Sequence, residues 1–128
     1  MSRVQLALNV TDLDTAVAFY SKLFDVEPAK REPGYANFAV TEPPLKLVLF
    51  EGAEGGTLNH LGVEVETTDQ VVATDGRLRA DGLDTATEDQ VTCCYAVQDK
   101  TWVTGPDGER WEVYTVLADA PNLSCTTC

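Results

Sequence analysis

Apolar and polar residues alternate in two stretches of the chain, one near its start and one near its middle. Residues 5–10 read Gln-Leu-Ala-Leu-Asn-Val, and residues 60–65 read His-Leu-Gly-Val-Glu-Val. A period of two predicts half-buried strands, each with one apolar face. The opposite face of each strand begins with a side chain that can coordinate a metal, Gln5 or His60. The pattern therefore indicates an internal repeat, with one copy beginning near residue 5 and the other near residue 60.

A helix signal follows each predicted strand. Residues 11–14, Thr-Asp-Leu-Asp, fit a capping box with an acidic third position, and apolar residues recur at helical spacing from Leu13 to Phe24. The second helix is predicted to begin near residues 67–70 and to end at Asp81-Gly82, with a weaker apolar stripe. Both halves of the chain thus begin as strand and then helix.

Two or three strands complete each half. Strand-like runs cover residues 35–40, 45–50, 92–96, 101–104 and 111–116, with a turn at 105–108 and a linker at 51–56. We expect an α+β fold in which two βαβββ modules form a barrel-like mixed sheet around a metal cleft. The expected boundaries are a single domain over residues 1–120, with modules at about 2–51 and 57–117. A tail over residues 118–128 carries Cys125 and Cys128.

Charge narrows the classes of partner. The 128 residues include 21 acidic and 9 basic ones, for a net charge of −12. Phosphate backbones and anionic lipid surfaces attract basic proteins, so we expect neither nucleic acid nor membrane as a partner. The absence of a long apolar run and of a charged, then apolar, leader predicts a cytoplasmic protein. In that reducing compartment, the four cysteines are expected to be ligands, reactive groups or core residues rather than disulfides.

Three side chains could form a metal site. His60 stands one repeat length after Gln5, and Glu112 occupies a polar position between Trp111 and Val113. An amide oxygen, an imidazole nitrogen and a carboxylate oxygen on one side of a metal resemble the facial triad of non-haem Fe(II) enzymes. Taken singly, the residues have simpler interpretations, a structural histidine and a solvated glutamate. Their related positions in the repeat favour the joint interpretation.

Cys93 and Cys94 are adjacent in sequence. Neighbouring side chains of a regular strand point to opposite faces, so two such thiols can grip one atom only at a bend or loop. The alternative is a pair of small residues buried in a strand. Cys125 and Cys128 form a terminal Cys-x-x-Cys, which fits a metal-binding tail or a frayed terminus equally well.

The motifs together resemble the vicinal oxygen chelate superfamily, and within it the organoarsenical carbon–arsenic lyases and the similar cadmium-induced proteins. The broader cues are residues 12–20 and 105–114; the closer ones are residues 1–8, 33–39, 42–49, 58–64 and 92–96. The resemblance implies that Gln5, His60 and Glu112 hold Fe(II). It also implies that Cys93 and Cys94 bind arsenic. Gln5 departs from the histidine usual at its place in the superfamily.

By this resemblance, we expect an enzyme that uses Fe(II) and dioxygen to cleave the carbon–arsenic bond of trivalent organoarsenicals such as methylarsonous acid. Two thiolates complete the three-coordinate arsenic of an organoarsenical, whereas inorganic As(III) favours three. A monomer or a homodimer is expected. The main alternative is a non-enzymatic protein that sequesters cadmium or arsenic. Glyoxalase-type isomerisation, extradiol dioxygenation and drug sequestration are further possibilities for this fold, but all three leave the cysteine pair unused.

Overall fold

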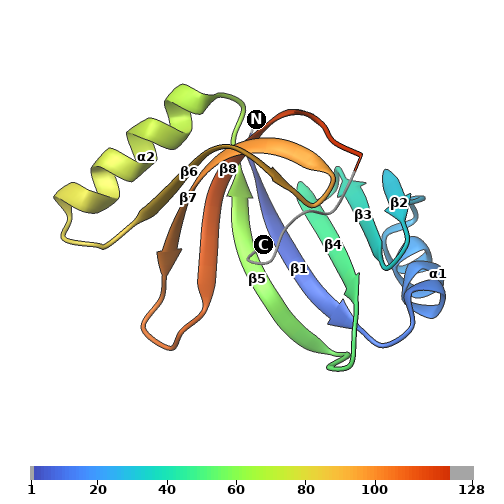
Figure 1. The fold of residues 1–128 in the computed structure, drawn as a ribbon. Coiled ribbons are helices and arrows are strands. Elements are labelled where there is room, and N and C mark those ends of the chain that lie inside the picture. The colour runs from blue at the N-terminus through green and yellow to red at the C-terminus, as the bar shows by residue number, and fades with distance from the viewer. Residues whose placement is uncertain (1, 122–128) are drawn as a thin grey trace. The chain divides into compact units, whose positions relative to one another are not determined.

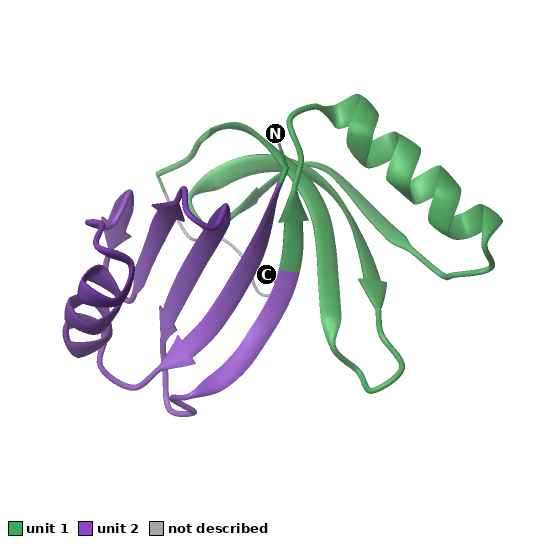
Figure 2. Ribbon diagram, turned by 180° about the vertical axis from the view of Figure 1, so that it is seen from behind, with its two compact units in different colours: residues 1–2, 62–128 green, residues 3–61 purple. Residues whose placement is uncertain are grey.

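The computed structural model describes residues 2–121 and divides the chain into two compact units. The N-terminal unit comprises residues 3–61, and the C-terminal unit comprises residues 1–2 and 62–128 (Figure 2). Of the tail predicted over residues 118–128, residues 122–128, with Cys125 and Cys128, lie outside the described part. Each unit is built around one βαβββ module, so the predicted α+β fold is confirmed. The predicted domain and module boundaries remain predictions.

The N-terminal unit contains a mixed sheet covered by one helix (Figure 1). Its elements are β1 (Arg3–Val10), α1 (Leu13–Phe24), β2 (Lys30–Glu32), β3 (Tyr35–Val40), β4 (Leu45–Glu51) and the first part of β5 (Thr57–Glu64). Strands β2, β3 and β4 are antiparallel neighbours, and β1 lies parallel to β4, with Gln5 opposite Lys46. The short strand β2 was not anticipated from the sequence.

An aliphatic cluster joins α1 to β3 and β4. Leu13 and Val17 of the helix are buried with Phe38, Leu47 and Leu49 of the strands. The predicted helical stripe is correct except at its end, where Leu23 is 58% exposed. The predicted cap is shifted by one residue, because Asp12 accepts the backbone N–H of Thr15 and is the N-cap in place of Thr11.

The C-terminal unit repeats the plan with the end of β5, α2 (Thr68–Ala80), β6 (Ala86–Cys93), β7 (Ala96–Thr104) and β8 (Arg110–Asp119). Strands β6, β7 and β8 form an antiparallel meander, and α2 contacts β7 and β8. The predicted start of α2 is confirmed, since Thr67 and Gln70 form a complete capping box. The predicted stop is also confirmed, with Asp81 as C-cap and Gly82 at a φ of 87°. Neither described helix is long and apolar enough to span a membrane.

Candidate functional site

Gln5 and His60 meet in the interior of the N-terminal unit. Gln5 projects from β1 and His60 from β5, and only 4% and 2% of these residues is exposed. Nε2 of Gln5 lies 3.2 Å from Nε2 of His60. The other ring nitrogen, Nδ1, lies 2.8 Å from Oδ1 of Asn59. The two predicted ligands of this unit are therefore adjacent, buried and held by polar contacts.

Glu112 lies on β8 in the C-terminal unit and forms a buried ion pair with Lys100 of β7. The Lys100 Nζ is 2.6 Å from Glu112 Oε1, and the two residues are 1% and 3% exposed. Lys100 stands opposite Tyr114, and Trp102 opposite Glu112, so these side chains share one face of the sheet. The Lys100 ammonium also lies 5.4 Å from the Trp102 ring centroid and 5.8 Å from that of Tyr114.

This ion pair fixes the Glu112 carboxylate. Removing a carboxylate from water is expensive, so a buried one needs a charged partner and good hydrogen-bond geometry. Lys100 supplies both through a short charge-assisted bond. The ammonium of Lys100 is thereby directed at Glu112. Nothing in a strand pattern identifies such a pair before the register of β7 against β8 is known.

Cys93 and Cys94 occupy a tight hairpin turn between β6 and β7. Cys93 ends β6 opposite Ala96, and Cys94 and Tyr95 form the turn with φ values of 55° and 64°. Two consecutive residues at positive φ are typical of a type I′ turn, which favours Asn and Gly. The sequence-predicted strand over residues 92–96 is therefore interrupted. The bend required by a shared thiol site is present.

The turn brings the two sulfur atoms to 3.5 Å from each other. A single soft atom bonded to both is sterically admissible at that separation, which a regular strand would prevent. Cys93 is buried and Cys94 is partly exposed. Cys93 takes part in a disulfide and Cys94 does not, contrary to the expectation that the cysteines are ligands, reactive groups or core residues rather than disulfides. Binding of arsenic by both sulfurs requires the reduced form of Cys93.

The chemistry of the proposed metal donors suits Fe(II). Imidazole nitrogen, carboxylate oxygen and amide oxygen form a mixed set of the kind that non-haem iron sites use. Among residues 2–121 no group of three or more His, Cys, Asp or Glu side chains is placed to hold a metal. The predicted set of Gln5, His60 and Glu112 includes only two residues of those types. The structure brings Gln5 next to His60 and Cys93 next to Cys94, each pair within its own unit, and their roles as metal and arsenic ligands remain predictions.

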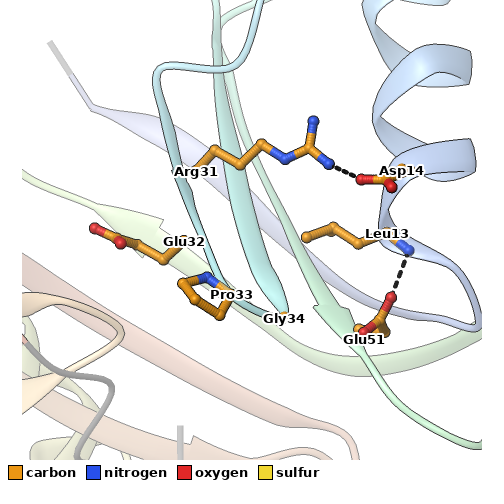
Figure 3. Close-up of a pocket in the computed structure, with 7 residues that line it drawn as sticks. All are labelled: Leu13, Asp14, Arg31, Glu32, Pro33, Gly34 and Glu51. Atoms are coloured by element: carbon orange, nitrogen blue, oxygen red, sulfur yellow. Dashed lines mark hydrogen bonds and ion pairs between the residues drawn. The ribbon is translucent and has the colours of Figure 1, made fainter.

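A separate pocket of about 430 Å³ opens in the N-terminal unit (Figure 3). Its lining residues are Leu13, Asp14, Arg31, Glu32, Pro33, Gly34 and Glu51. Glu51 Oε2 accepts the backbone N–H of Leu13 at 2.8 Å, and Arg31 pairs with Asp14. These contacts cap α1 and join it to β2, so Glu51, Asp14 and Arg31 have structural partners. None of the predicted site residues lines it.

Comparison with known proteins identifies the family to which this fold belongs. The family model described as the Glyoxalase/Bleomycin resistance protein/Dioxygenase superfamily matches residues 3–113, and the chain belongs to that superfamily. It is 67% identical over 121 residues to the cadmium-induced protein CadI of Mycobacterium tuberculosis, covering 94% of this chain and 80% of that protein. It is 61% identical over 126 residues to the trivalent organoarsenical cleaving enzyme of Thermomonospora curvata, covering 97% and 83%.

Solved structures show the same fold at low sequence identity. The 2,3-dioxygenase LapB from Pseudomonas sp. KL28 aligns with a TM-score of 0.70 at 18% identity, over 92% of this chain and 42% of that one. The Mn(II)-bound glyoxalase from Novosphingobium aromaticivorans aligns with a TM-score of 0.67 at 23% identity, over 94% and 42%. These likenesses concern the fold alone.

Proposed function

We propose that this chain is an Fe(II)- and dioxygen-dependent enzyme that cleaves the carbon–arsenic bond of trivalent organoarsenicals and releases inorganic As(III). The observation that carries the proposal is the turn that holds Cys93 and Cys94 with their sulfurs 3.5 Å apart. Its support from relatives is the 61% identity to a protein named as a trivalent organoarsenical cleaving enzyme. Methylarsonous acid is the simplest substrate of this class.

The cysteines bind the arsenical. In the reduced protein, the thiols of Cys93 and Cys94 replace the two hydroxyl groups of methylarsonous acid, forming two S–As bonds and releasing two molecules of water. Arsenic keeps its methyl group and becomes three-coordinate, as soft thiolate ligands favour. A third thiol is not needed, and the site thereby favours an organoarsenical over arsenite. Tyr95 follows Cys94 in the same turn.

Gln5, His60 and Glu112 are the proposed holders of iron. Lys100 neutralises Glu112 and fixes one of its oxygens, and the buried surroundings of Gln5 and His60 exclude water. Bound Fe(II) would supply the one-electron chemistry that lets dioxygen react with the organoarsenical. One molecule of methylarsonous acid and one of dioxygen give one molecule of arsenous acid and one of formaldehyde, so the reaction needs no further reductant. The contribution of the chain is to position the reactants.

One assay tests this proposal. The protein is treated with a phosphine reductant, loaded with Fe(II) without oxygen, mixed with methylarsonous acid and then exposed to air, with arsenic speciation of the products. We expect inorganic As(III) from the wild-type chain. His60→Ala should lose product but retain bound arsenical, and Cys94→Ser should lose the bound arsenical. Equal turnover by carefully metal-stripped protein would exclude the iron mechanism.

A second candidate function is non-enzymatic sequestration of cadmium or arsenic. The 67% identity to the cadmium-induced protein CadI favours it, and the cysteine turn would serve it equally well. Sequestration needs neither dioxygen nor Fe(II). Stoichiometric binding with unchanged methylarsonous acid after aerobic incubation would establish this function over cleavage.

A further inference from the structure

A continuous chain of hydrogen bonds runs from the linker between the modules to His60. The Thr57 hydroxyl lies 2.6 Å from the Glu54 carbonyl oxygen, and Asn9 Nδ2 lies 2.9 Å from the same hydroxyl oxygen. Asn59 Nδ2 lies 2.9 Å from Asn9 Oδ1, and Asn59 Oδ1 lies 2.8 Å from Nδ1 of His60. Every member belongs to the N-terminal unit.

The chain has only one self-consistent direction. A backbone carbonyl can only accept, so the single hydroxyl proton of Thr57 is donated to Glu54. Thr57 Oγ1 must then accept from Asn9, which turns the Asn9 amide nitrogen toward it and the Asn9 oxygen toward Asn59. The same logic orients the Asn59 amide with its nitrogen toward Asn9.

The last link fixes the imidazole. Once Asn59 presents its oxygen to His60, that contact is a hydrogen bond only if Nδ1 carries a proton. The neutral ring therefore has its lone pair on Nε2. Gln5 then donates its amide N–H to Nε2 across the 3.2 Å contact. A metal at Nε2 has to replace that hydrogen bond.

We propose that Thr57, Asn9 and Asn59 are positioning residues that hold His60 as the Nδ1-protonated tautomer and reserve Nε2 for the metal. The proposal rests on the proposed function in one respect, the role of His60 as a ligand. Groups that orient a metal-binding histidine through its other nitrogen usually change metal affinity by about 10- to 100-fold when removed. The direction of the hydrogen-bond chain is set by the Glu54 carbonyl oxygen, which can only accept a hydrogen bond.

The linker is built to hold that carbonyl in place. Gly56 donates its N–H to Asn9 O at 2.8 Å, and Gly52 donates to Val10 O at 2.8 Å. A Cβ on Gly55 would lie 2.0 Å from the Thr11 hydroxyl oxygen, so glycine permits the close approach of linker and β1. Gly56 adopts a φ of 85°, which favours glycine. The glycines of the linker therefore hold it close to β1 and do not serve flexibility alone.

The test uses the fact that His60 is the chain's single histidine. Full-length, metal-free protein labelled with nitrogen-15 in histidine gives one imidazole spin system, in which long-range proton–nitrogen couplings identify the protonated nitrogen of the neutral ring. We expect protonated Nδ1 in the wild type. Thr57→Ser keeps the hydroxyl and should keep this state, whereas Thr57→Val and Asn59→Ala should give mixed tautomers.

Anaerobic titration with Fe(II), and with Co(II) as a spectroscopic probe, measures how each variant changes the metal affinity. Asn59→Ala should bind the metal at least about 10-fold more weakly, and Thr57→Val, at the exposed end of the chain, about two- to tenfold more weakly. Thr57→Ser should match the wild type. If Asn59→Ala fails to fold, the comparison of Thr57→Val with Thr57→Ser still tests the positioning role, because Thr57 is exposed.

Three outcomes overturn the proposal. Protonated Nε2 in the wild-type ring contradicts the direction of the chain. An unchanged tautomer and unchanged metal affinity in both Thr57→Val and Asn59→Ala remove the positioning role. If the wild-type tautomer is as expected but neither metal perturbs the His60 signals, the tautomer assignment stands and the proposed iron site fails, and with it the positioning role.

Discussion

The two modules build equivalent hairpins from very different residues. In the N-terminal unit, Pro33 and Gly34 connect β2 to β3, and Gly34 has a φ of 71°. In the C-terminal unit, Cys94 and Tyr95 connect β6 to β7, both at positive φ. Glycine tolerates such angles, whereas other residues are strained by about 1–3 kcal/mol each. The second turn retains its side chains despite this cost, which favours a functional role for them.

The two helices are also anchored differently. Helix α1 buries Leu13 and Val17 in the aliphatic cluster, whereas α2 buries Val71 and depends on polar contacts. The Thr68 hydroxyl donates to Asp99 at 2.6 Å, and the Thr101 hydroxyl donates to Asp75 at 3.0 Å. The stability of the C-terminal unit should therefore be more sensitive to charge than that of the N-terminal unit.

The largest expected effect comes from breaking the buried ion pair. Lys100→Met leaves the Glu112 carboxylate buried without its cation and should lower the free energy of unfolding by about 3–5 kcal/mol. Urea unfolding measures this change. The double variant Lys100→Met/Glu112→Leu should recover most of the loss, because an apolar pair needs no desolvated charge. Lys22→Met, at an exposed position of the N-terminal unit, is the control. If Lys100→Met lowers the free energy of unfolding no more than Lys22→Met does, the contrast between the units is contradicted.

A smaller effect is expected at Asp75, together with a pH dependence. The Thr85 hydroxyl at 2.5 Å, followed by Thr101 and Arg79, holds the pKa of this carboxyl below its usual value against the effect of burial. The stabilisation is therefore complete above pH of about 4 and is lost as pH falls through the lowered pKa. Asp75→Asn should cost about 1–3 kcal/mol at neutral pH.

Urea unfolding of both proteins at a series of pH values tests this sign. The difference in unfolding free energy between wild type and Asp75→Asn should shrink as the solution is acidified below about pH 4. Asp84→Asn, at an exposed loop position, is the matched control and should give a small difference at every pH. A gap that is constant or widens in acid would show that Asp75 does not stabilise α2 as a carboxylate.

The smallest effect sharpens the hairpin comparison. Cys94→Gly should raise the free energy of unfolding by about 1 kcal/mol, because glycine adopts the left-handed conformation without a Cβ clash. The same variant should lose binding of methylarsonous acid. Cys94→Ser keeps the backbone strain and loses the thiol, so it separates the two effects. Thermal unfolding and arsenical titration are the measurements, and a destabilised Cys94→Gly chain would refute the strain argument.

Much of the fold could be predicted because it depends on local periodicity. The strands β1 and β5, the stripe of α1, and the Thr67–Gln70 cap of α2 are confirmed. The expectation of half-buried strands is wrong, because the faces that carry Gln5 and His60 are more buried than the aliphatic faces. The three-residue strand β2 was missed because its ladder to β3, rather than its own pattern, defines it. The cap of α1 moved to Asp12 since neighbouring polar residues compete for the same backbone N–H groups.

At the candidate site, the reactive groups can be read from the amino-acid order alone: one imidazole, an adjacent pair of thiols, and a glutamate at a polar position of its strand. The surroundings of these groups depend on how the chain folds. The tertiary structure placed Lys100 against Glu112 through strand register, turned the backbone at Cys94, and gave the hydrogen-bond chain to His60 its direction. Such contacts join residues distant in sequence, and local patterns of polarity carry no information about which distant partner each side chain meets.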